Sequence, residues 1–486
     1  MKKAIVFALT MLLFISGFPS KSYALPDEQS AAIQALLNEA CRKSGVPGMS
    51  VSILADDEVY YFSSGYADRE KELSASENTL YELASVSKAF TATGILLLEE
   101  QGRLSMTDSV QKYLPWFTLK YQRKPVDMHR LTLNHFLHHT SGLTNSRHTQ
   151  NIPQGNTPDM LQKTVEMLAD AELAFPPGEQ YNYGTVNYDV LGLVIETVSG
   201  QSYEDFMREQ VFQPLGLRQT YVYKEDARAA GQMAKGYRSS FFMTIPYHAP
   251  DYAGNKPAGY LISCTKDMAR WMGIQIGIVQ DIPEIFHTVI DKSHQGDLSV
   301  PAVNEMYYAA GWQVNAGQTM IEHSGGNPNF STQVTLLPKE GKAVCLLTNG
   351  ANTNISLVQK IIAILDGNLT QSYEISGTQL LDILLSSATI IFCLLAVLFF
   401  LSGLRRVKRN EPQPITKKTI IVTVIFLAAT ILSIMCWAFP MFIGYGWSKI
   451  LVWQTYSVLT ALISSSLLSA SIAWFVYTQR YHASLR

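Results

Sequence analysis

Residues 81–88 read YELASVSK and place Ser85 and Lys88 three positions apart. An apolar run from Ala89 to Leu98 follows at once, so the pattern predicts a helix that starts near Ser85. Side chains at positions i and i+3 of a helix share one face. A lysine whose pKa is lowered by burial could therefore accept the hydroxyl proton of Ser85, while backbone N–H groups at the helix start bind a developing oxyanion.

The Ser-x-x-Lys spacing alone is a weak signal, because it occurs three times in the chain. The three pairs are Ser85/Lys88, Ser109/Lys112 and Ser263/Lys266. Only the first pair opens a long apolar run, and a capping serine beside a solvated lysine explains such a spacing without any chemistry. The rest of the sequence therefore decides what residues 81–88 do.

Composition sets wide bounds on the class of protein. The 486 residues suggest two or three domains, and a net charge of −2 leaves no basic surface for nucleic acid. Hydrophobic residues make up 47% of the chain and are concentrated at its two ends. The five cysteines form neither a CxxC pair nor a metal-binding spacing, so we expect no disulfide framework, with a single bridge left open. We also expect no metal and no cofactor.

The N-terminus has the pattern of a secretory signal peptide. A positive start, MKK, precedes the apolar run Ala4 to Phe18, and small residues at 22 and 24 predict cleavage after Ala24. An uncleaved anchor is the alternative, but the run is short for a spanning helix. Either interpretation predicts that the domain from residue 25 to about 370 is exported.

That domain is predicted to form one sheet from both of its ends. A helix over Asp27–Lys43 precedes strands at Val51–Leu54 and Val59–Ser63, which are joined at Asp56-Asp57. Four further strands and a closing helix come late in the domain. They are expected at Ala310–Val314, Thr319–Glu322, Ser331–Leu337, Ala343–Leu347 and Ile355–Leu365. Residues 323–330, HSGGNPNF, lie between two of these strands, and residues 235–256 read as polar and irregular.

Two other stretches carry candidate functional side chains. His135 and His139 stand four positions apart beside His138, which could suit zinc, but no third ligand follows and ring packing is the favoured interpretation. Residues 181–189, YNYGTVNYD, follow a Pro-Pro-Gly turn and lead into an apolar helix predicted over Val190–Val198. Loops that lead into helices are common places for catalytic groups.

The C-terminal part, residues 371–486, is predicted to be a membrane domain. Its three apolar runs, Ile383–Leu404, Thr419–Phe439 and Ile450–Tyr477, are each long enough to cross a lipid bilayer. The basic segment RRVKR at 405–409 follows the first run and predicts a cytoplasmic loop. The domain before the runs would then lie outside the cytoplasmic membrane and the C-terminus inside.

Three stretches in this order, SxxK at 85–88, the tyrosine loop and HSG at 323–325, resemble the penicillin-recognising serine hydrolases: class C β-lactamases, DD-peptidases and related esterases. The resemblance covers about Asp27 to Leu365 and includes HTSGL at 139–143 and PLGL at 214–217. It implies an α/β (α+β) fold in which an antiparallel sheet is flanked by helices and joined to an all-helical subdomain.

Roles follow from the resemblance by position. Ser85 would be the nucleophile, Lys88 its buried partner and Tyr183 the acid/base on the facing loop, with Tyr181 as the alternative in register. Whether Lys88 or Tyr183 takes the first proton stays open. The backbone N–H groups of Ser85 and Gly326 would form the oxyanion hole.

Two motifs depart from the family pattern. The family's Tyr-x-Asn is Tyr183-Gly184-Thr185 here, and its Lys-Thr-Gly begins with His323. The lysine of that triplet normally holds a substrate carboxylate, whereas histidine is only partly charged near neutral pH. The substitution therefore argues against a β-lactam or a C-terminal D-alanine as substrate.

The whole layout is similar to a narrower group, the membrane-anchored peptidases that remove an N-acyl-D-asparagine cap during colibactin and zwittermicin maturation. By position, the residues that read the D-asparagine side chain would be Thr185, His248 and Asn327, and the substrate-binding set also includes Glu82 and His323. Amide and hydroxyl partners suit a primary carboxamide, which both donates and accepts hydrogen bonds.

The resemblance thus implies an extracytoplasmic serine peptidase that hydrolyses N-acyl-D-amino acid amides through a Ser85 acyl-enzyme. Its partners would be an acylated, D-amino-acid-capped small molecule or peptide and the lipid bilayer, with a homodimer left open and no nucleic acid. Two alternatives remain: a β-lactamase, DD-peptidase or esterase of the same superfamily, and a non-catalytic penicillin-binding sensor.

Overall fold

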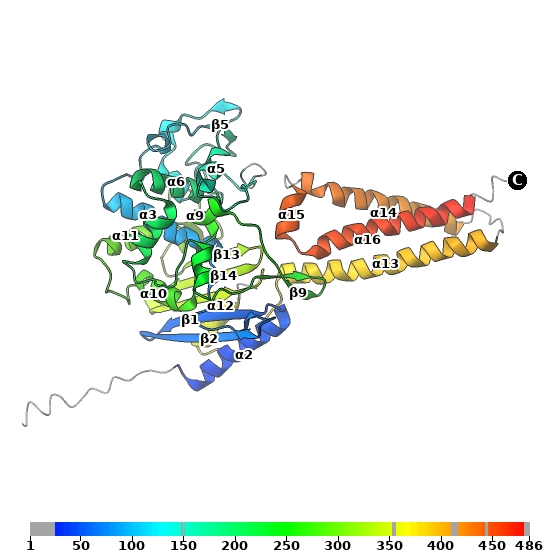
Figure 1. The fold of residues 1–486 in the computed structure, drawn as a ribbon, viewed down its shortest axis with the longest axis horizontal. Coiled ribbons are helices and arrows are strands. Elements are labelled where there is room, and N and C mark those ends of the chain that lie inside the picture. The colour runs from blue at the N-terminus through cyan, green and yellow to red at the C-terminus, as the bar shows by residue number, and fades with distance from the viewer. Residues whose placement is uncertain are drawn as a thin grey trace, which may run out of the picture.

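An eight-stranded antiparallel sheet is the centre of the N-terminal domain in the computed structural model, which describes residues 25–146, 149, 151–351, 356–409, 417–442 and 446–480 (Figure 1). The strand order is β11-β12-β13-β14-β15-β1-β2-β3. The bounds are β1 Gly48–Ala55, β2 Glu58–Asp68, β3 Leu73–Ser74, β11 Met306–Tyr308, β12 Gln313–Asn315, β13 Ile321–Asn327, β14 Phe330–Leu337 and β15 Lys342–Thr348. Because β1 pairs with both β2 and β15, the predicted sheet from both ends of the domain is confirmed.

Helices cover both faces of this sheet, and every residue of β1 is consequently buried. On one face α2 (Asp27–Ser44) and α12 (Ser356–Leu365) pack against strand residues such as Val51. On the other face α10 (Thr265–Gln275) lies against β1 and β15. Full burial of one large apolar side chain stabilises a fold by about 1.5–3 kcal/mol. The two-sided packing buries the apolar face of β1, with Met49, Val51 and Ile53, and also Ser50 and Ser52 on its other face.

The turn between β1 and β2 has the geometry that its sequence predicts. Asp56 and Asp57 have φ angles of 53° and 62°. Two successive left-handed residues match the right-handed twist of the flanking strands, and aspartate tolerates this conformation better than most residues. The predicted hairpin is therefore confirmed, with strands longer than expected at both ends.

A mainly helical region with three small sheets separates β3 from β11 among the described residues. Its helices are η1 Ala84–Val86, α3 Ser87–Glu100, η2 Val110–Lys112, η3 Met128–Arg130, α4 Leu133–Leu137, α5 Met160–Glu166, α6 Asn187–Ser199, α7 Tyr203–Phe206, η4 Met207–Phe212, α8 Lys224–Ala229, η5 Ala253–Asn255, α9 Lys256–Gly259, α10 and α11 Ile285–Ser293. Its strands are β4 Tyr81–Glu82, β5 Leu119–Tyr121, β6 Lys124–Pro125, β7 Ala171–Glu172, β8 Tyr237–Ser240, β9 Met243–Pro246 and β10 Ile262–Ser263, and η6, Pro338–Glu340, links β14 to β15. All five cysteines are free.

Two local predictions were wrong. Residues 235–256 are not simply irregular, because they contain the β8–β9 hairpin. HSGGN at 323–327 is not a connection between strands but the second half of β13, paired residue by residue with β14. Glycine usually weakens a strand, but here a glycine is required where the strand passes close to other backbone.

The C-terminal helices extend away from the sheet as a separate bundle (Figure 1). They are α13 Gly377–Arg409, α14 Lys417–Phe442, α15 Trp447–Trp453 and α16 Tyr456–Arg480, and α16 packs along both α13 and α14. Two helices, Gly377–Lys408 and Tyr456–Thr478, are long and apolar enough to cross a membrane. The apolar part of α14, Thr423–Ala438, is shorter than that criterion, so three spans are not established. The predicted signal peptide lies outside the described residues.

The third apolar run, predicted as one helix, is two helices. Gln454 at the end of α15 has extended backbone, and α16 begins at Tyr456. The last carbonyls of α15 are held by the N-terminal domain, because Arg238 of β8 donates from Nη1 to the oxygens of Leu451 and Val452 at 2.9 and 3.1 Å. A buried cation at a helix C-terminus stabilises unpaired carbonyls.

A second polar contact joins the β8–β9 hairpin to the bundle. Asp382 of α13 accepts hydrogen bonds from the backbone N–H groups of Phe241 and Phe242 at 3.2 and 3.0 Å, and from Ser457 Oγ at 2.6 Å. The Asp382 side chain is buried. Together with the Arg238 contact, it fixes where α15 lies on the N-terminal domain.

Candidate active site

Ser85 lies in the short 3-10 turn η1, immediately before α3 begins at Ser87. The predicted helix is therefore confirmed, but it starts two residues later than the pattern suggested. Ala84 has a φ of 47°, an unfavourable left-handed conformation for a residue with a Cβ. The hydrogen bond from Leu83 N to Leu261 O, 2.8 Å long, helps to fix this turn and presents the partly exposed Ser85 to a cavity.

Lys88 is fully buried one turn into α3. Its Nζ lies 3.3 Å from Ser85 Oγ and donates a 2.6 Å hydrogen bond to the backbone oxygen of Ala258. Burial lowers the pKa of Lys88 to about 7, although the nearby Asp189 opposes that shift. A substantial fraction of Lys88 is thus a neutral amine at neutral pH, within reach of a hydroxyl proton.

A buried carboxyl group, which sequence reasoning did not single out, supports the lysine. Asp189 of α6 accepts a 2.6 Å hydrogen bond from Asn255 Nδ2, and Asn255 precedes α9, which contains Ala258. Burial raises the pKa of Asp189 well above its usual range, while Asn255, Lys88 and the backbone of Ala258 counteract that shift. The Asp189–Asn255 hydrogen bond thus links α6 to the segment that includes Ala258, whose carbonyl accepts the hydrogen bond from Lys88 Nζ.

Tyr183 completes the surroundings of Lys88, whose Nζ lies 5.0 Å from the centre of the Tyr183 ring. The Tyr183 hydroxyl is buried and has no well-formed hydrogen bond among the described residues. Burial raises its pKa, with Ser85 and Thr185 acting in the opposite direction. The alternative in register, Tyr181, instead stacks on Tyr308 with ring centres 5.7 Å apart, so the geometry favours Tyr183.

His323 is buried behind this group and is uncharged at neutral pH. Tyr308 donates its hydroxyl proton to His323 Nε2 at 3.1 Å, because Nδ1 donates to the Ser324 carbonyl at 2.7 Å. Burial and the neighbouring Lys88 lower the pKa of His323 to about 3. This histidine therefore supplies no positive charge where the family carries a lysine.

The two glycines after Ser324 have different surroundings. A Cβ on Gly325 would lie 2.5 Å from Leu83 O and 3.0 Å from Ser85 N, so only glycine lets β13 approach the Ser85 turn so closely. Gly326 is exposed and lines the same cavity as Ser85. Its position is compatible with the predicted oxyanion hole.

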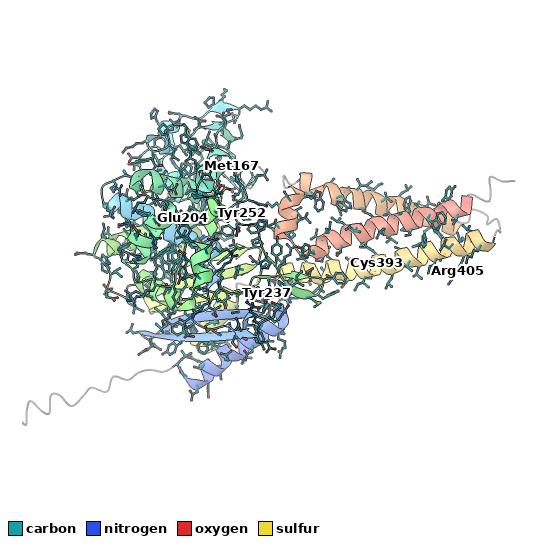
Figure 2. The ribbon with its side chains drawn as sticks, viewed as in Figure 1. Met167, Glu204, Tyr237, Tyr252, Cys393 and Arg405 are labelled. Atoms are coloured by element: carbon teal, nitrogen blue, oxygen red, sulfur yellow. The ribbon has the colours of Figure 1, made fainter. Side chains whose placement is uncertain are left out.

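The cavity in front of Ser85 has a volume of about 620 Å³ and walls from both parts of the molecule. The N-terminal domain contributes Ser85, Asn145, Thr149, Ile152, Thr185, Asn255, Ala258, Gly259, Gly326 and Asn327. The C-terminal helices contribute Leu381, Lys449, Ile450, Trp453, Gln454 and Val458. Tyr252, which lies on the side of the N-terminal domain toward α15 (Figure 2), borders a smaller neighbouring cavity that also includes Lys449 and Trp453.

The predicted substrate-binding residues fall into three groups. Thr185 and Asn327 line the Ser85 cavity. Glu82 lies behind that wall, where it accepts a 2.7 Å hydrogen bond from Asn327 Nδ2 and pairs with Lys224 at 3.2 Å, and His323 is likewise behind it. His248 is exposed and lines a different cavity. The structure therefore brings together two of the five.

The three early histidines do not form a metal site. His135 Nδ1 accepts a hydrogen bond from the backbone N–H of Thr132 at the start of α4. His138 Nδ1 donates to the Tyr308 carbonyl, and His139 Nδ1 accepts from Asn187 Nδ2. Among the described residues, no group of three side chains could hold a metal ion. The packing interpretation of these histidines fits these contacts.

Comparison with known proteins identifies the family. The sequence model of the family described as "Beta-lactamase" matches residues 31–369. The chain belongs to the beta-lactamase family. Members of this beta-lactamase and penicillin-binding-protein superfamily are typically serine hydrolases, which agrees with the Ser85–Lys88 geometry.

The individual relatives of this beta-lactamase-family chain have low sequence identity to it, but the similarity covers most of its length. Protein flp from Staphylococcus aureus (strain MW2) is 26% identical over 91% of this chain and 89% of its own length, so the similarity continues past the family domain into the C-terminal helices. Penicillin-binding protein 4* from Bacillus subtilis is 28% identical over 65% of this chain and 71% of its own. The octameric penicillin-binding protein homologue from Pyrococcus abyssi has a TM-score of 0.59 at 26% identity, covering 70% of this chain and 77% of that one.

Proposed function

We propose that this protein is a membrane-anchored serine peptidase that hydrolyses N-acyl-D-amino acid amides, with N-acyl-D-asparagine as the favoured acyl part. The observation that carries the proposal is the 3.3 Å approach of Lys88 Nζ to Ser85 Oγ in a buried site. A hydroxyl beside a neutral amine, open to a cavity on its other side, is suited to acyl transfer.

In the proposed reaction Ser85 Oγ attacks the amide carbonyl carbon as its proton passes to the neutral Nζ of Lys88. The backbone N–H groups of Ser85 and Gly326 stabilise the oxyanion. The leaving amine takes a proton through Tyr183, the ester to Ser85 forms, and water then releases the acid. Lys88 is favoured over Tyr183 as the first base, because burial lowers the pKa of Lys88 to about 7 and raises that of Tyr183.

The proposed specificity follows from which groups face the cavity. Thr185 offers a hydroxyl group, and Asn327 offers its Oδ1, because Asn327 Nδ2 already donates to Glu82 and to the Gly259 carbonyl. A hydroxyl and an amide oxygen match a primary carboxamide better than a carboxylate, which cannot donate to Oδ1. His323 is neutral, so the β13 side of the site lacks the cation that a β-lactam or D-alanine carboxylate would need. His248 lies in another cavity and is not part of this proposal.

The membrane placement is proposed from the C-terminal helices. Side chains such as Leu394 of α13 and Ile434 of α14 are exposed, which suits contact with lipid. Arg405 lies at the end of α13 remote from the N-terminal domain (Figure 2), as expected for a cytoplasmic basic loop and an extracytoplasmic active site.

The test uses the full-length protein in nanodiscs of zwitterionic lipid, with matched octanoyl-D-Asn and octanoyl-L-Asn anilides as substrates. We expect release of aniline from the D-substrate and none from either substrate with Ser85→Ala. Equal turnover of the two stereoisomers would overturn the D-specificity, and undiminished turnover by Ser85→Ala would overturn the mechanism.

A second candidate is favoured by the similarity to penicillin-binding protein 4* of Bacillus subtilis: hydrolysis or binding of β-lactams. Covalent labelling of Ser85 by a fluorescent penicillin would support this candidate. We expect no labelling, because the cation on β13 that would hold the β-lactam carboxylate is replaced by the buried, neutral His323, and the cation that does line the cavity, Lys449, belongs to α15 instead.

A further inference from the structure

Lys449 is the one charged side chain among the described residues that line the Ser85 cavity. It belongs to α15 (Trp447–Trp453), the short helix that leads into α16. The Arg238 bonds to the last carbonyls of α15 hold this segment against the N-terminal domain. Asp382 adds to this, because it accepts from the backbone of Phe241 and Phe242 on one side and from Ser457 on the other. The lysine is therefore placed at the cavity by contacts that do not depend on its own charge.

The surroundings of Lys449 are partly apolar. Its Nζ lies 5.8 Å from the centre of the Trp453 ring, and burial lowers its pKa to about 8, so the side chain remains largely protonated at neutral pH. Leu381, Ile450 and Val458 form the adjoining wall. A cation beside an apolar wall is suited to a ligand that has both an acidic group and an alkyl chain.

The opposite wall provides no competing charge. His323 is neutral and lies behind the wall, and the ammonium of Lys88 is already directed at Ser85 Oγ and the Ala258 carbonyl. An anionic group on a substrate bound at Ser85 would therefore find its cation on α15 and not on β13.

We propose that Lys449 binds a carboxylate on the leaving-group side of the substrate, while the alkyl chain of the acyl group lies along Leu381, Ile450 and Val458. This inference rests on the proposed function and names its substrate class: amphiphilic N-acyl amino acid amides whose amine portion carries an acid. The C-terminal helices thus contribute a specificity-determining residue, in addition to any role as an anchor.

The experiment compares two matched ligands, octanoyl-D-Asn-Gly and octanoyl-D-Asn-glycinamide, on the full-length protein in nanodiscs of phosphatidylcholine. We expect the free acid to have a KM about ten-fold lower than the glycinamide, since charge-assisted hydrogen bonds contribute on the order of ten-fold or more. Lys449→Gln should remove that difference with little change in kcat, and Lys449→Arg should keep it. The exposed Lys339, changed to Gln, is the matched control and should leave the difference intact.

Binding to Ser85→Ala, measured by calorimetry with the same two ligands, separates this inference from the proposed function. A carboxylate preference that Lys449→Gln abolishes in the Ser85→Ala background supports the inference even if turnover is never seen. An equal affinity for both ligands, or a preference that survives Lys449→Gln, overturns it.

A lipid phosphate could occupy the same cation, so the calorimetry is repeated with phosphatidylglycerol in the nanodiscs. Competition by phosphatidylglycerol against the acid, lost in Lys449→Gln, supports an oxyanion site that prefers the substrate carboxylate. Inhibition by phosphatidylglycerol without any carboxylate preference assigns the site to a lipid headgroup and overturns the substrate assignment.

Discussion

Ser85/Lys88 and Ser109/Lys112 have the same residue types at the same spacing, yet their surroundings differ. Lys88 is fully buried, its Nζ is 3.3 Å from Ser85 Oγ, and its pKa is lowered to about 7. Ser109 caps η2 by accepting from Gln111 N, while Lys112 is exposed and pairs with Asp108 at 2.9 Å, which raises its pKa.

The difference between the two pairs is one of solvation. Removal of water from an ammonium without a carboxylate partner favours the neutral amine, whereas a nearby carboxylate favours the charged form. Only the first pair therefore yields a base at neutral pH. The spacing brings the groups within reach, and burial against α9 and α6 turns them into a reactive pair.

The largest expected effect separates the two serines. Ser85→Ala should reduce kcat/KM for the D-Asn substrate by about 10⁴ or more, because the covalent step is lost. Ser109→Ala should leave kcat/KM unchanged and lower folding stability by about 1–2 kcal/mol, since the helix cap and the 2.7 Å hydrogen bond from Ser109 Oγ to the Met128 carbonyl are both removed. Initial rates and thermal unfolding of both variants test the contrast, and a large rate loss in Ser109→Ala would contradict it.

The next effect separates the two lysines. Lys88→Met should lower kcat/KM by about 10² to 10⁴, as expected for loss of a general base, while Lys112→Met should not. Burst-phase kinetics would locate the loss in acylation. Near-normal acylation by Lys88→Met would assign the first proton to Tyr183 instead.

The same substitution should make the protein more stable. The folded pKa of Lys88, about 7, lies below the ordinary lysine value of 10.5, so burial of its charge destabilises the fold fully below pH 7 and not at all above about 10.5. Lys88→Met should therefore raise stability by on the order of a few kcal/mol at pH 6 and by less at pH 10. Unfolding temperatures at the two pH values measure this, with Lys112→Met as the control that shows no such gain.

The acylation rate should fall about ten-fold per pH unit below pH 7, because Lys88 must be neutral to accept the proton of Ser85. A single-turnover profile from pH 5 to 9 in the native protein tests this. The Lys112→Met variant should have the same profile, and a rate independent of pH across this range would exclude Lys88 as the base.

The smallest effect concerns the carboxyl group behind Lys88. Asp189→Asn should reduce kcat by a few-fold, roughly ten-fold at most, because the amide still bridges to Asn255 but positions the Ala258 carbonyl less well. It should also move the acid limb of the pH profile to lower pH, since Asp189 raises the pKa of Lys88. If Asp189 had a purely structural role, Asp189→Asn would lower the unfolding temperature without moving the acid limb of the pH profile.

The sequence allowed much of this arrangement to be predicted where the determinants are local. The Asp56-Asp57 turn and the apolar run after Lys88 are each set by neighbours in the chain. The closing of the sheet by β1 and β15 followed from strand patterns at both ends of the domain. The order of the three motifs led to the family that the comparisons bear out.

What could not be predicted depends on long-range packing. His323 was expected to face substrate, but its side chain is buried against Tyr308, and the strand character of HSGGN is masked by its glycines. The break at Gln454 is hidden inside an apolar run, so the placement of Lys449 on the wall of the Ser85 cavity could not be foreseen. Asp189 is the last residue of the stretch YNYGTVNYD at 181–189, but its link to Lys88 through Asn255 and Ala258 exists only in the folded chain.

The register of the central sheet has a consequence for the order in which the chain folds. Strand β1 is completed by β15, where Met49 faces Thr348 about 300 positions later. Until the ribosome has delivered that last strand, the edge of β1 that pairs with β15 is open, although α2 is already present to pack on one face of the β1–β2 hairpin. Contacts of such sequence separation form slowly, and open edges invite aggregation in the meantime. We therefore expect the newly made chain to aggregate more readily than a protein of similar size whose sheet is paired locally.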